Sequence, residues 1–450
     1  MAKKINKILL VRPDAIGDVV LMIPLINSIK ATFPDSQIVT LQQGYTKALL
    51  DNHPNVSEVI VDWKKSGKIK SIRDFFTYAA YLKSFHFDAV IFSYIDMFYA
   101  ALAIAAGIPI RVGDKNRLLQ RLLLTHPIKQ NFRNLMKHET EQNIDLLYGL
   151  TDTVAVDHTM NLFYEKETDR KKNSYILIHP TTGGGNRAWL SEKYSQLIDR
   201  IHDQTDLDVI VSGSGQKDIA IAEKIAQGCK RKPINLAGKT TLDELKALVA
   251  SAKVVIGTDT GPTHIAAAFQ IPVLSISPTK FVKSLRWGPW QTVNKIVGNP
   301  KQCNWICNPY QCVKLDCLEA IDVKSAFDEL MILMEKPPRV ENNKREWFRA
   351  SINIGIYGHN PEYTARLKKI NLSVYKLDIP WWRLDKIISF IWQRDINVIH
   401  LFPGKMKWYW KGIVRQLSAL RLYCPPVICD FPDTVDDPIE DYMKAFYATD

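Results

Sequence analysis

Short apolar runs alternate with longer amphipathic stretches along most of the 450-residue chain. The first run, residues 7–12, is compact and apolar, as expected of a buried parallel strand. Similar runs follow at 37–41, 57–63 and 88–94, and an apolar-rich helix is predicted near residues 19–33. This alternation of strand and helix predicts a parallel sheet that is covered on both faces.

A charged stretch without apolar periodicity, residues 164–173, interrupts this alternation and is interpreted as a linker. A second α/β run then begins, with strand candidates at 175–181, 208–215, 234–238, 253–259 and 272–278. The pattern therefore predicts two similar α/β domains, residues 1–165 and residues 173–336.

A third segment, residues 345–450, repeats the α/β rhythm on a smaller scale. Its strand candidates lie at 352–358, 372–378, 396–402 and 425–432. We expect a small additional sheet, and no motif within it assigns it a role.

The composition, with 46% hydrophobic and 24% charged residues, excludes a disordered or collagen-like chain. The longest apolar run, residues 100–110, is too short to span a bilayer, and the N-terminus lacks a secretory signal pattern. The seven cysteines do not suggest a disulfide framework, so we expect a reducing, cytoplasmic location. A net charge of +12 predicts an anionic partner, but no nucleic-acid-binding signature is present, so nucleic acid is not expected.

The first candidate site lies in RPDAIGDVVLMIP, residues 12–24, where a glycine-containing turn joins a strand to a helix. Ligand loops of α/β proteins occupy this place, at the carboxyl end of a parallel strand. Asp18 follows Gly17 near the predicted helix start, and it is either a helix N-cap or a functional carboxylate. No GxGxxG pattern occurs here, so a dinucleotide fingerprint is not supported.

The second candidate site is IGTDTGPTHIAAAFQIP, residues 256–272. A strand is predicted to end at Asp259, whose carboxylate can accept hydrogen bonds from sugar hydroxyls. Thr260 and Gly261 are small, so a phosphate can approach the N-terminus of the following helix, and His264 can donate to it. The alternative is an ordinary capped helix that carries a solvated histidine.

The third candidate site is HPTTGGGNRAW, residues 179–189. The hydroxyls of Thr181 and Thr182, the backbone of three glycines and the guanidinium of Arg187 together make a plausible anion cradle. The loop lacks the Lys-Ser/Thr ending of a Walker A motif. The alternative is a plain glycine-rich connection.

IGDVVLMIP near the N-terminus and DTGPTHIAAA in the second half, in this order and separation, resemble glycosyltransferase family 9, the bacterial lipopolysaccharide heptosyltransferases. PVLSISPT and RWGPW also resemble this family, and the resemblance extends over about residues 5–335. It implies a GT-B fold, in which two Rossmann-like domains face a cleft: the first on the acceptor side, the second binding most of the donor.

The resemblance implies an inverting, metal-independent and cofactor-free transfer of heptose from ADP-heptose to the lipopolysaccharide inner core, onto an acceptor of the lipid A–Kdo type. Asp18 matches the position of the family's catalytic base. The matched donor-binding positions are Thr181 and Thr182 at the diphosphate, Arg187 as the basic residue before Trp189, Asp259 at the heptose, and Thr260, Gly261 and His264 around the diphosphate.

Two departures from the family pattern keep alternatives open. The acidic residue that often holds the ribose is not evident near SGSGQKD, where Gln216 or Asp218 stands, so another donor such as UDP-GlcNAc remains an alternative. Pro13 and Asp14 replace the small polar pair before the glycine turn. A non-catalytic sugar-nucleotide-binding protein is a further alternative, although it would be expected to lose Asp18 or the Asp259 motif.

Four cysteines gather near the end of the second predicted domain, at Cys303, Cys307, Cys312 and Cys317. Their spacing is loose for a structural zinc site, so reduced, packed thiols are the favoured interpretation.

Two basic stretches suggest peripheral binding to an anionic membrane surface: residues 111–137, and the Trp-rich segment 404–417. The alternatives are a solvated charged face for the first stretch and aromatic core packing for the second.

Overall fold

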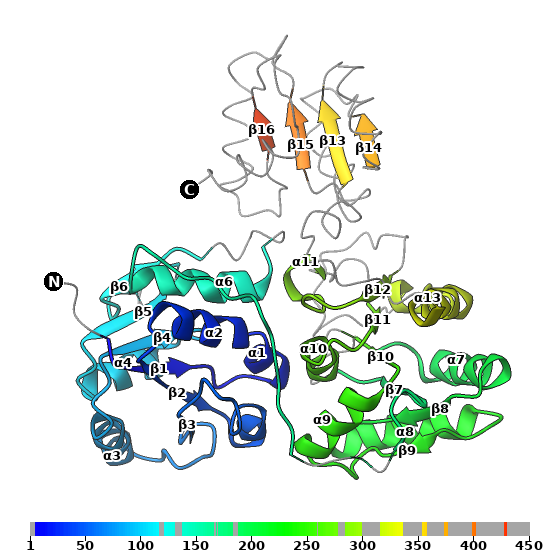
Figure 1. The fold of residues 1–450 in the computed structure, drawn as a ribbon, viewed down its shortest axis with the longest axis horizontal. Helices are drawn as coiled ribbons and strands as arrows, with labels where there is room; N and C mark the ends of the chain where they lie inside the picture. The colour runs from blue at the N-terminus through cyan, green and yellow to red at the C-terminus, as the bar shows by residue number, and fades with distance from the viewer. Residues whose placement is uncertain are drawn as a thin grey trace. The chain divides into compact units, whose positions relative to one another are not determined.

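The chain forms two compact units, Met1–Val340 and Glu341–Asp450. The computed structural model describes residues 5–116, 121–130, 137–165, 168, 170–182, 188–258, 260–277, 284–298 and 316–335, together with four strands between residues 353 and 429. The first unit contains two six-stranded sheets and the second contains one four-stranded sheet (Figure 1). Both large α/β domains therefore lie within one compact unit, while their limits at 165–173 and 336–345 stay predictions.

The N-terminal sheet contains six parallel strands in the order β3-β2-β1-β4-β5-β6. Its strands are β1 Lys7–Val11, β2 Gln37–Gln42, β3 Glu58–Val61, β4 Ala89–Phe92, β5 Ile110–Asp114 and β6 His126–Ile128. The helical segments are α1 Ile16–Val20, α2 Ile23–Thr32, η1 Gly44–Leu49, α3 Ile72–Lys83, α4 Met97–Ala105, α6 Glu139–Asp145 and η2 Leu146–Gly149. This strand order is that of a Rossmann fold.

Side-chain alternation along β1 explains why helices cover both faces of the sheet. Ile8 and Leu10 pack into one buried cluster with α1 and α2, whereas Leu9 and Val11 pack into another with α3 and α4. Successive residues of a strand point to opposite faces, so an uninterrupted apolar run requires cover on both sides.

The second sheet has the same topology, in the order β12-β11-β10-β7-β8-β9, and is also parallel. Its strands are β7 Tyr175–His179, β8 Asp208–Val211, β9 Ile234–Asn235, β10 Val254–Gly257, β11 Val273–Ile276 and β12 Asn294–Val297. Its helices are α7 Ser191–Gln204, α8 Gly215–Gly228, α9 Leu242–Ser251, α10 Gly261–Ala268, α11 Ser284–Trp287, α12 Asp316–Glu319 and α13 Val323–Glu335. Counted from β7, the order is again that of a Rossmann fold.

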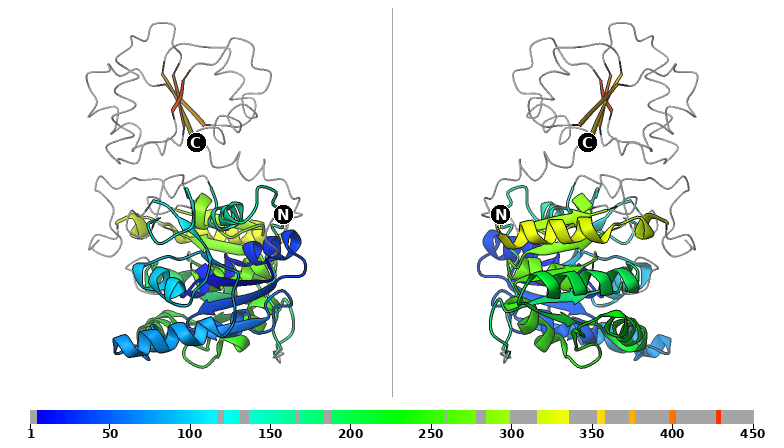
Figure 2. Two further views of the ribbon diagram at one scale, coloured as in Figure 1. Left: turned by 90° about the vertical axis from the view of Figure 1, so that its left-hand side faces the viewer. Right: turned by 90° about the vertical axis from the view of Figure 1, so that its right-hand side faces the viewer.

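The facing sides of the two domains share one core. A single buried apolar cluster contains Ile8 and Val19 of the first domain as well as Leu177, Leu248 and Ile265 of the second. The outer face of the second sheet packs separately, against α7, α8 and α13 (Figure 2). Helices of both domains therefore form a common apolar layer between the sheets.

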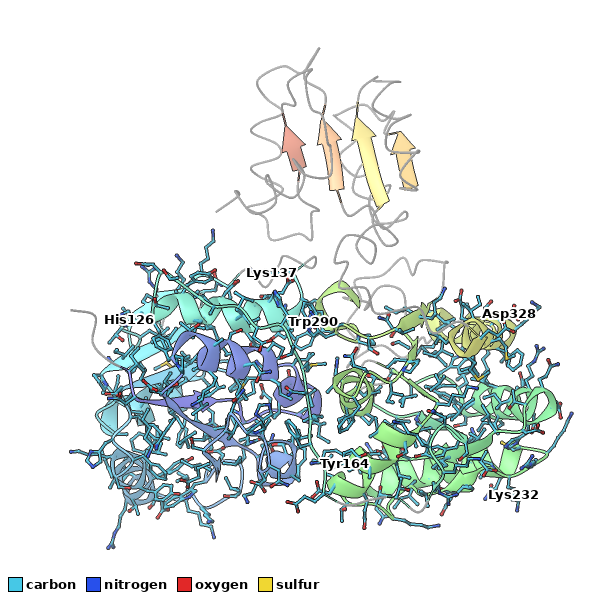
Figure 3. All side chains as sticks on the ribbon, viewed as in Figure 1. His126, Lys137, Tyr164, Lys232, Trp290 and Asp328 are labelled. Carbon is cyan, nitrogen blue, oxygen red and sulfur yellow. The ribbon has the colours of Figure 1, made fainter. Side chains whose placement is uncertain are left out.

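The segment that follows η2, residues 150–164, is called the crossing segment, and it contacts the second domain at several residues. Trp290 donates its indole N–H to the carbonyl of His158 at 3.1 Å, and Tyr164 packs edge-on against Phe269 at 5.4 Å between ring centroids. Figure 3 shows Trp290 and Tyr164 near opposite ends of this crossing segment. Buried Lys246 of α9 donates to the carbonyl of Phe163 at 2.8 Å.

The structure confirms the strand candidates of the two large domains and corrects the sequence analysis at several places. The single helix expected near 19–33 is two helices, because Pro24 has no N–H to continue the first one and instead sits in the first turn of α2. Strands β5, β6 and β12 were not predicted. Two of these are short edge strands, and β5 carries charged residues among its few apolar ones, so their patterns are weak.

The second unit contains four parallel strands, β13 Asn353–Tyr357, β14 Ser373–Lys376, β15 Val398–Leu401 and β16 Val427–Cys429. All four coincide with predicted strands. Their order is β14-β13-β15-β16, so the third strand pairs with the first. In both Rossmann-like domains the third strand pairs with the second, and the described strands of this unit therefore follow a different topology.

Other predictions fall partly outside the described residues. Cys303, Cys307 and Cys312 lie outside them, as does segment 404–417, while Cys317 is half-buried. Within the described part of the chain, no group of three His, Cys, Asp or Glu side chains is placed to hold a metal ion. No described helix is both long and apolar enough to cross a membrane.

Candidate functional site

The two motif helices of the first unit meet through two glycines. A Cβ atom at Gly17 of α1 would lie 2.7 Å from Cδ2 of His264 in α10. A Cβ atom at Gly261 of α10 would lie 2.6 Å from Cγ2 of Ile16 in α1. Real Cβ atoms do not approach other heavy atoms this closely, so the contact requires glycine on both sides. The amino-terminal turns of the two helices thus converge at the junction of the domains (Figure 1).

Asp18 is in the first turn of α1 and is not its N-cap. The N-cap residue is Ala15, and no side chain caps this helix. The Asp18 carboxylate instead accepts a hydrogen bond at 2.5 Å from Nη2 of Arg12, at the carboxyl end of β1. The side chain of Asp18 is 25% exposed, so another group can still reach it. The capping interpretation of Asp18 is therefore wrong, whereas its functional interpretation stays open.

Arg12 is the buried cation at the centre of this site. Its Nη1 donates to the carbonyl of Ser93 at 2.5 Å and to the Ser93 hydroxyl at 3.0 Å, which fixes the guanidinium. Burial by itself would lower the pKa of Arg12, but the carboxylates of Asp18, Glu139 and Asp14 raise it. The guanidinium therefore stays charged.

Asp14 lies beside the same guanidinium, with its Oδ2 3.3 Å from Nε of Arg12. Burial raises the pKa of Asp14 to about 6, and the neighbouring carboxylates of Asp18 and Glu139 act in the same direction. The opposing cations are Arg12 and Lys65. The site thus carries a second carboxyl group that changes its charge near neutral pH.

A buried ion pair joins this site to the second domain. Nε and Nη2 of Arg286 donate to Oε2 of Glu139 at 2.9 and 2.8 Å, and Nη2 of Arg12 lies 3.5 Å from Oε1 of the same carboxylate. The sequence analysis did not single out Arg12, Glu139 or Arg286 individually. Arg12 carried one available signal, a charged residue directly after a buried strand.

His264 lies in this junction and is buried, so the alternative interpretation, a solvated histidine, is wrong. The ring of a second buried histidine, His138, packs at a tilt against Trp290 with 4.4 Å between ring centroids, and its Nε2 lies 3.0 Å from the carbonyl of Gly288. A carbonyl only accepts, so Nε2 carries the proton. Burial lowers the pKa of His138 to about 4, which keeps the ring neutral at pH 7.

The backbone at the start of α10 provides fewer free donors than expected. The N–H groups of Thr263 and His264 both donate to the carbonyl of Thr260, at 3.1 and 3.3 Å, and Pro262 has no N–H. Of residues 261–264, Gly261 is therefore the one whose backbone N–H is not used in these bonds. Asp259 lies outside the described residues.

The loop after β7 begins next to the loop after β10, because His179 and Gly257 are paired in the sheet. Thr181 is buried and its hydroxyl lies 3.4 Å from Nε2 of His179, while Thr182 is half-buried. Burial lowers the pKa of His179 to about 4. The structure thus brings Thr181 and Thr182 to the same sheet edge as Thr260, Gly261 and His264, and Arg187 lies outside the described residues.

The residues that follow β8 differ in availability. The carboxylate of Asp218 accepts the N–H of Ser214 at 2.8 Å and so closes its own loop, whereas Gln216 is exposed. Asp218 is therefore committed to the turn, and Gln216 is the freer of the two side chains proposed for the nucleotide.

Comparison with known proteins identifies the family of the chain. The model of glycosyltransferase family 9 (heptosyltransferase) matches residues 76–316, more than half of the chain. Lipopolysaccharide heptosyltransferase 3 of Escherichia coli is 30% identical over 290 residues, which cover 61% of this chain and 82% of that protein.

Solved structures agree with the fold. A family 9 glycosyltransferase from Veillonella parvula superposes with a TM-score of 0.61 at 17% identity, covering 74% of this chain and 98% of the other. The ADP-heptose lipopolysaccharide heptosyltransferase II of Escherichia coli superposes with a TM-score of 0.58 at 20% identity, covering 73% and 98%. The two Rossmann-like domains form a GT-B fold, and the chain belongs to glycosyltransferase family 9, the heptosyltransferase family.

Proposed function

We propose that this protein is an inverting glycosyltransferase that transfers heptose from ADP-heptose to a lipopolysaccharide core acceptor, with Asp18 as the general base. The observation that carries this proposal is the glycine contact between α1 and α10. This contact places the helix that carries Asp18 directly against α10, which carries Gly261 and His264 of the predicted donor motif. A Cβ atom added at Gly17 would lie 2.7 Å from Cδ2 of His264.

In the proposed reaction, an acceptor hydroxyl attacks the anomeric carbon of the heptose. The new C–O bond forms as the bond to the ADP oxygen breaks, and Asp18 takes the hydroxyl proton. Arg12 holds one oxygen of Asp18 at 2.5 Å, which orients the carboxylate toward the junction. Attack from the side opposite the leaving group inverts the anomeric configuration, which fits a base and a donor site on different domains.

The donor would be held mainly by the second domain. The proposed contacts to the diphosphate are the hydroxyls of Thr181 and Thr182, the guanidinium of Arg187 and the start of α10 at Thr260, Gly261 and His264. Asp259 would orient the heptose. The converging N-terminal turns of α1 and α10 add positive dipole ends beside the diphosphate. We infer that these groups neutralise the leaving group without a metal, so turnover in excess EDTA should equal turnover with added Mg²⁺.

ADP-heptose is proposed as donor because two relatives support it: the similar structure is an ADP-heptose transferase by name, and the similar sequence is a lipopolysaccharide heptosyltransferase. A lipopolysaccharide acceptor is proposed on the same basis, and its lipid A–Kdo type rests on the family resemblance of the sequence alone. The purified protein should release ADP from ADP-heptose in the presence of truncated lipopolysaccharide. Release of UDP from UDP-GlcNAc instead would identify a different donor, and release of neither would favour a non-catalytic binding protein.

We further propose a cytoplasmic protein that binds anionic membranes peripherally. Arg121 and Lys129 of the basic stretch are exposed, whereas Arg111 donates to the carbonyl of Leu123 and Lys137 pairs with Asp145 at 2.6 Å. Of the basic side chains of this stretch that the structure describes, some are therefore available for an anionic surface and others are engaged within the protein. Binding to anionic vesicles should exceed binding to neutral ones and should be lost at 1 M salt, where screening acts within about 3 Å.

A further inference from the structure

Charged side chains alternate in sign along a path from the proposed base to the second domain. Asp18 is bound by Arg12 at 2.5 Å, Arg12 lies 3.5 Å from Glu139, and Glu139 accepts from Arg286 at 2.8 and 2.9 Å. Arg286 belongs to α11 of the second domain, while the other three belong to the first. The path therefore crosses the junction of the two domains.

The inner members of this path are nearly inaccessible to water. The side chains of Arg12, Glu139 and Arg286 are 5%, 4% and 8% exposed, respectively. Buried charges interact more strongly than surface charges, and removing one partner leaves the other uncompensated. A change at one end of the path must therefore alter the electrostatics at the other end.

One nitrogen is shared between two carboxylates. Nη2 of Arg12 is the atom that donates to Asp18, and it is also the atom nearest to Oε1 of Glu139. The charge of Glu139 therefore competes with Asp18 for the same donor. Arg286 in turn reduces the pull of Glu139 on Arg12, because it binds the other oxygen of that carboxylate.

We propose that Glu139 is a positioning residue that sets how firmly Arg12 holds Asp18, and that Arg286 adjusts Glu139 from the second domain. This inference rests on the proposed role of Asp18 as the base. Its consequence is that the strength of the base depends on contact between the two domains. A base is therefore fully set only when the acceptor-side and donor-side domains are together.

Substitutions of Glu139 and Arg286 should shift the protonation of Asp18 in opposite directions. Glu139→Gln removes the competing charge, so Arg12 holds Asp18 more firmly and the base stays ionised to lower pH. Arg286→Met leaves Glu139 uncompensated, so Glu139 draws Arg12 away and the base takes up its proton at higher pH. A loss of packing or folding has no reason to produce shifts of opposite sign.

Other charged or titratable groups surround Asp18 but are common to both variants. Asp14 lies before α1, Tyr45 lies in η1, Lys65 follows β3, His138 precedes α6, and His264 lies in α10. Besides burial, Glu139 contributes to the raised pKa of Asp14 and Arg286 to the lowered pKa of His138, so these two groups also respond to the substitutions. The NMR signal of the Asp18 carboxyl group, described below, separates the base from them.

The test is the pH dependence of kcat/KM for ADP release from ADP-heptose with truncated lipopolysaccharide. We expect the acid limb to move down by about one pH unit in Glu139→Gln and up by about one in Arg286→Met, the scale of a single nearby charge. The double variant should match Glu139→Gln, because Arg286 acts through Glu139, and Arg286→Lys, which keeps the charge, should remain near the wild type. If Arg286→Met does not fold, Arg286→Gln, which also removes the charge, takes its place, and its limb should likewise move up.

Lys246→Met provides a matched control at the domain junction. Lys246 donates to the carbonyls of Ala48 and Phe163 across the domains but has no contact with Arg12 or Glu139. Its loss should lower stability and leave the acid limb in place. Equal limbs in all variants, or shifts of the same sign in Glu139→Gln and Arg286→Met, would overturn the proposal.

A second readout separates this proposal from the proposed function. ¹³C-carboxyl NMR titration, with the Asp18 signal assigned by its loss in Asp18→Asn, reports the same opposite shifts without any turnover. Absent turnover with opposite NMR shifts would reject the transferase function alone. Turnover together with unmoved NMR signals would reject the role of Glu139 alone.

Discussion

The two Rossmann-like domains share one strand order, yet the loops after their central strands carry opposite kinds of chemistry. After β1, the first domain places Arg12, Asp14 and Asp18 within a few residues of each other. After β7 and β10, the described residues of the second domain provide hydroxyls, a glycine and a histidine instead. Carboxylates repel a diphosphate, so the difference fits an acceptor-activating side that is kept apart from an anion-binding side.

The largest effect on turnover should come from Asp18 in the first domain. Asp18→Asn keeps the shape of the side chain but removes its basicity, so turnover should fall by about 10²–10⁴-fold, the scale of a lost acid–base group. ADP affinity, measured by calorimetry, should be unchanged because the side chains proposed to bind the donor lie on the other domain. Turnover close to that of the wild type would show that Asp18 is not the base.

Turnover should be nearly as sensitive to a substitution in the glycine contact between α1 and α10. Gly261→Ala places a methyl group 2.6 Å from Ile16, so the helices must separate, and turnover should fall by about 10²-fold as it does for small misplacements of reacting groups. Gly44→Ala is the matched control, because its Cβ would lie an ordinary 3.5 Å from Val61. If both variants turned over alike, the glycine contact would have no catalytic importance.

Substitutions in the proposed donor site of the second domain should change the affinity for ADP more than the pH dependence of turnover. Arg187→Met should weaken ADP binding by about 10- to 100-fold, the value of one or two charge-assisted hydrogen bonds, while the acid limb of the pH profile stays in place. Lys232→Met, at an exposed position of the same domain, should leave ADP binding unchanged (Figure 3). Undiminished ADP affinity in Arg187→Met would remove this residue from the donor site.

The last effect concerns stability rather than turnover or binding, and buried histidines of both domains contribute to it. Burial lowers the pKa values of His53 and His138 in the first domain and of His179 in the second to about 4. The unfolded chain binds more protons than the folded chain between pH 4 and 6.5, so acidification from pH 7 to 5 should cost about 2 kcal/mol per histidine. The raised pKa of Asp14, about 6, acts in the opposite sense and offsets part of this cost in the first domain only.

Urea unfolding at pH 7 and pH 5 measures this difference. His179→Asn should reduce the loss on acidification, whereas substitution of the exposed His126 should not change it (Figure 3). An unfolding free energy that is independent of pH in this range would contradict the neutral state of the buried histidines.

Sequence patterns were sufficient for the parts of the fold that depend on local periodicity. Apolar runs such as residues 7–12 and 175–181 predicted central strands, since a strand buried on both faces must be apolar throughout. The edge strands β6 and β12 were not predicted, because a short strand at the edge of a sheet has little apolar pattern. The family resemblance supplied the position of Asp18 but not its partner.

The remainder of the site depends on contacts between residues that are distant in sequence. Glu139 and Arg286 are 147 positions apart and meet only because the two domains pack together. Likewise, the burial of His264 follows from the approach of Gly17, which no local pattern around residue 264 indicates. Such pairs become visible only when the two sheets are placed side by side.

The crossing segment has a practical consequence for exchanging domains between related transferases. His158 and Phe163 offer their carbonyls to Trp290 and Lys246 of the second domain, while the amide of Asn27 donates to the carbonyl of Thr159 from α2 of the first. A fusion point within this segment that changes the path of the backbone displaces these carbonyls and leaves a buried ammonium or amide without its acceptor. A fusion point after it, between Tyr164 and Tyr175, would let the first partner keep the whole segment, and the carbonyls that it offers are backbone atoms that any incoming sequence also possesses.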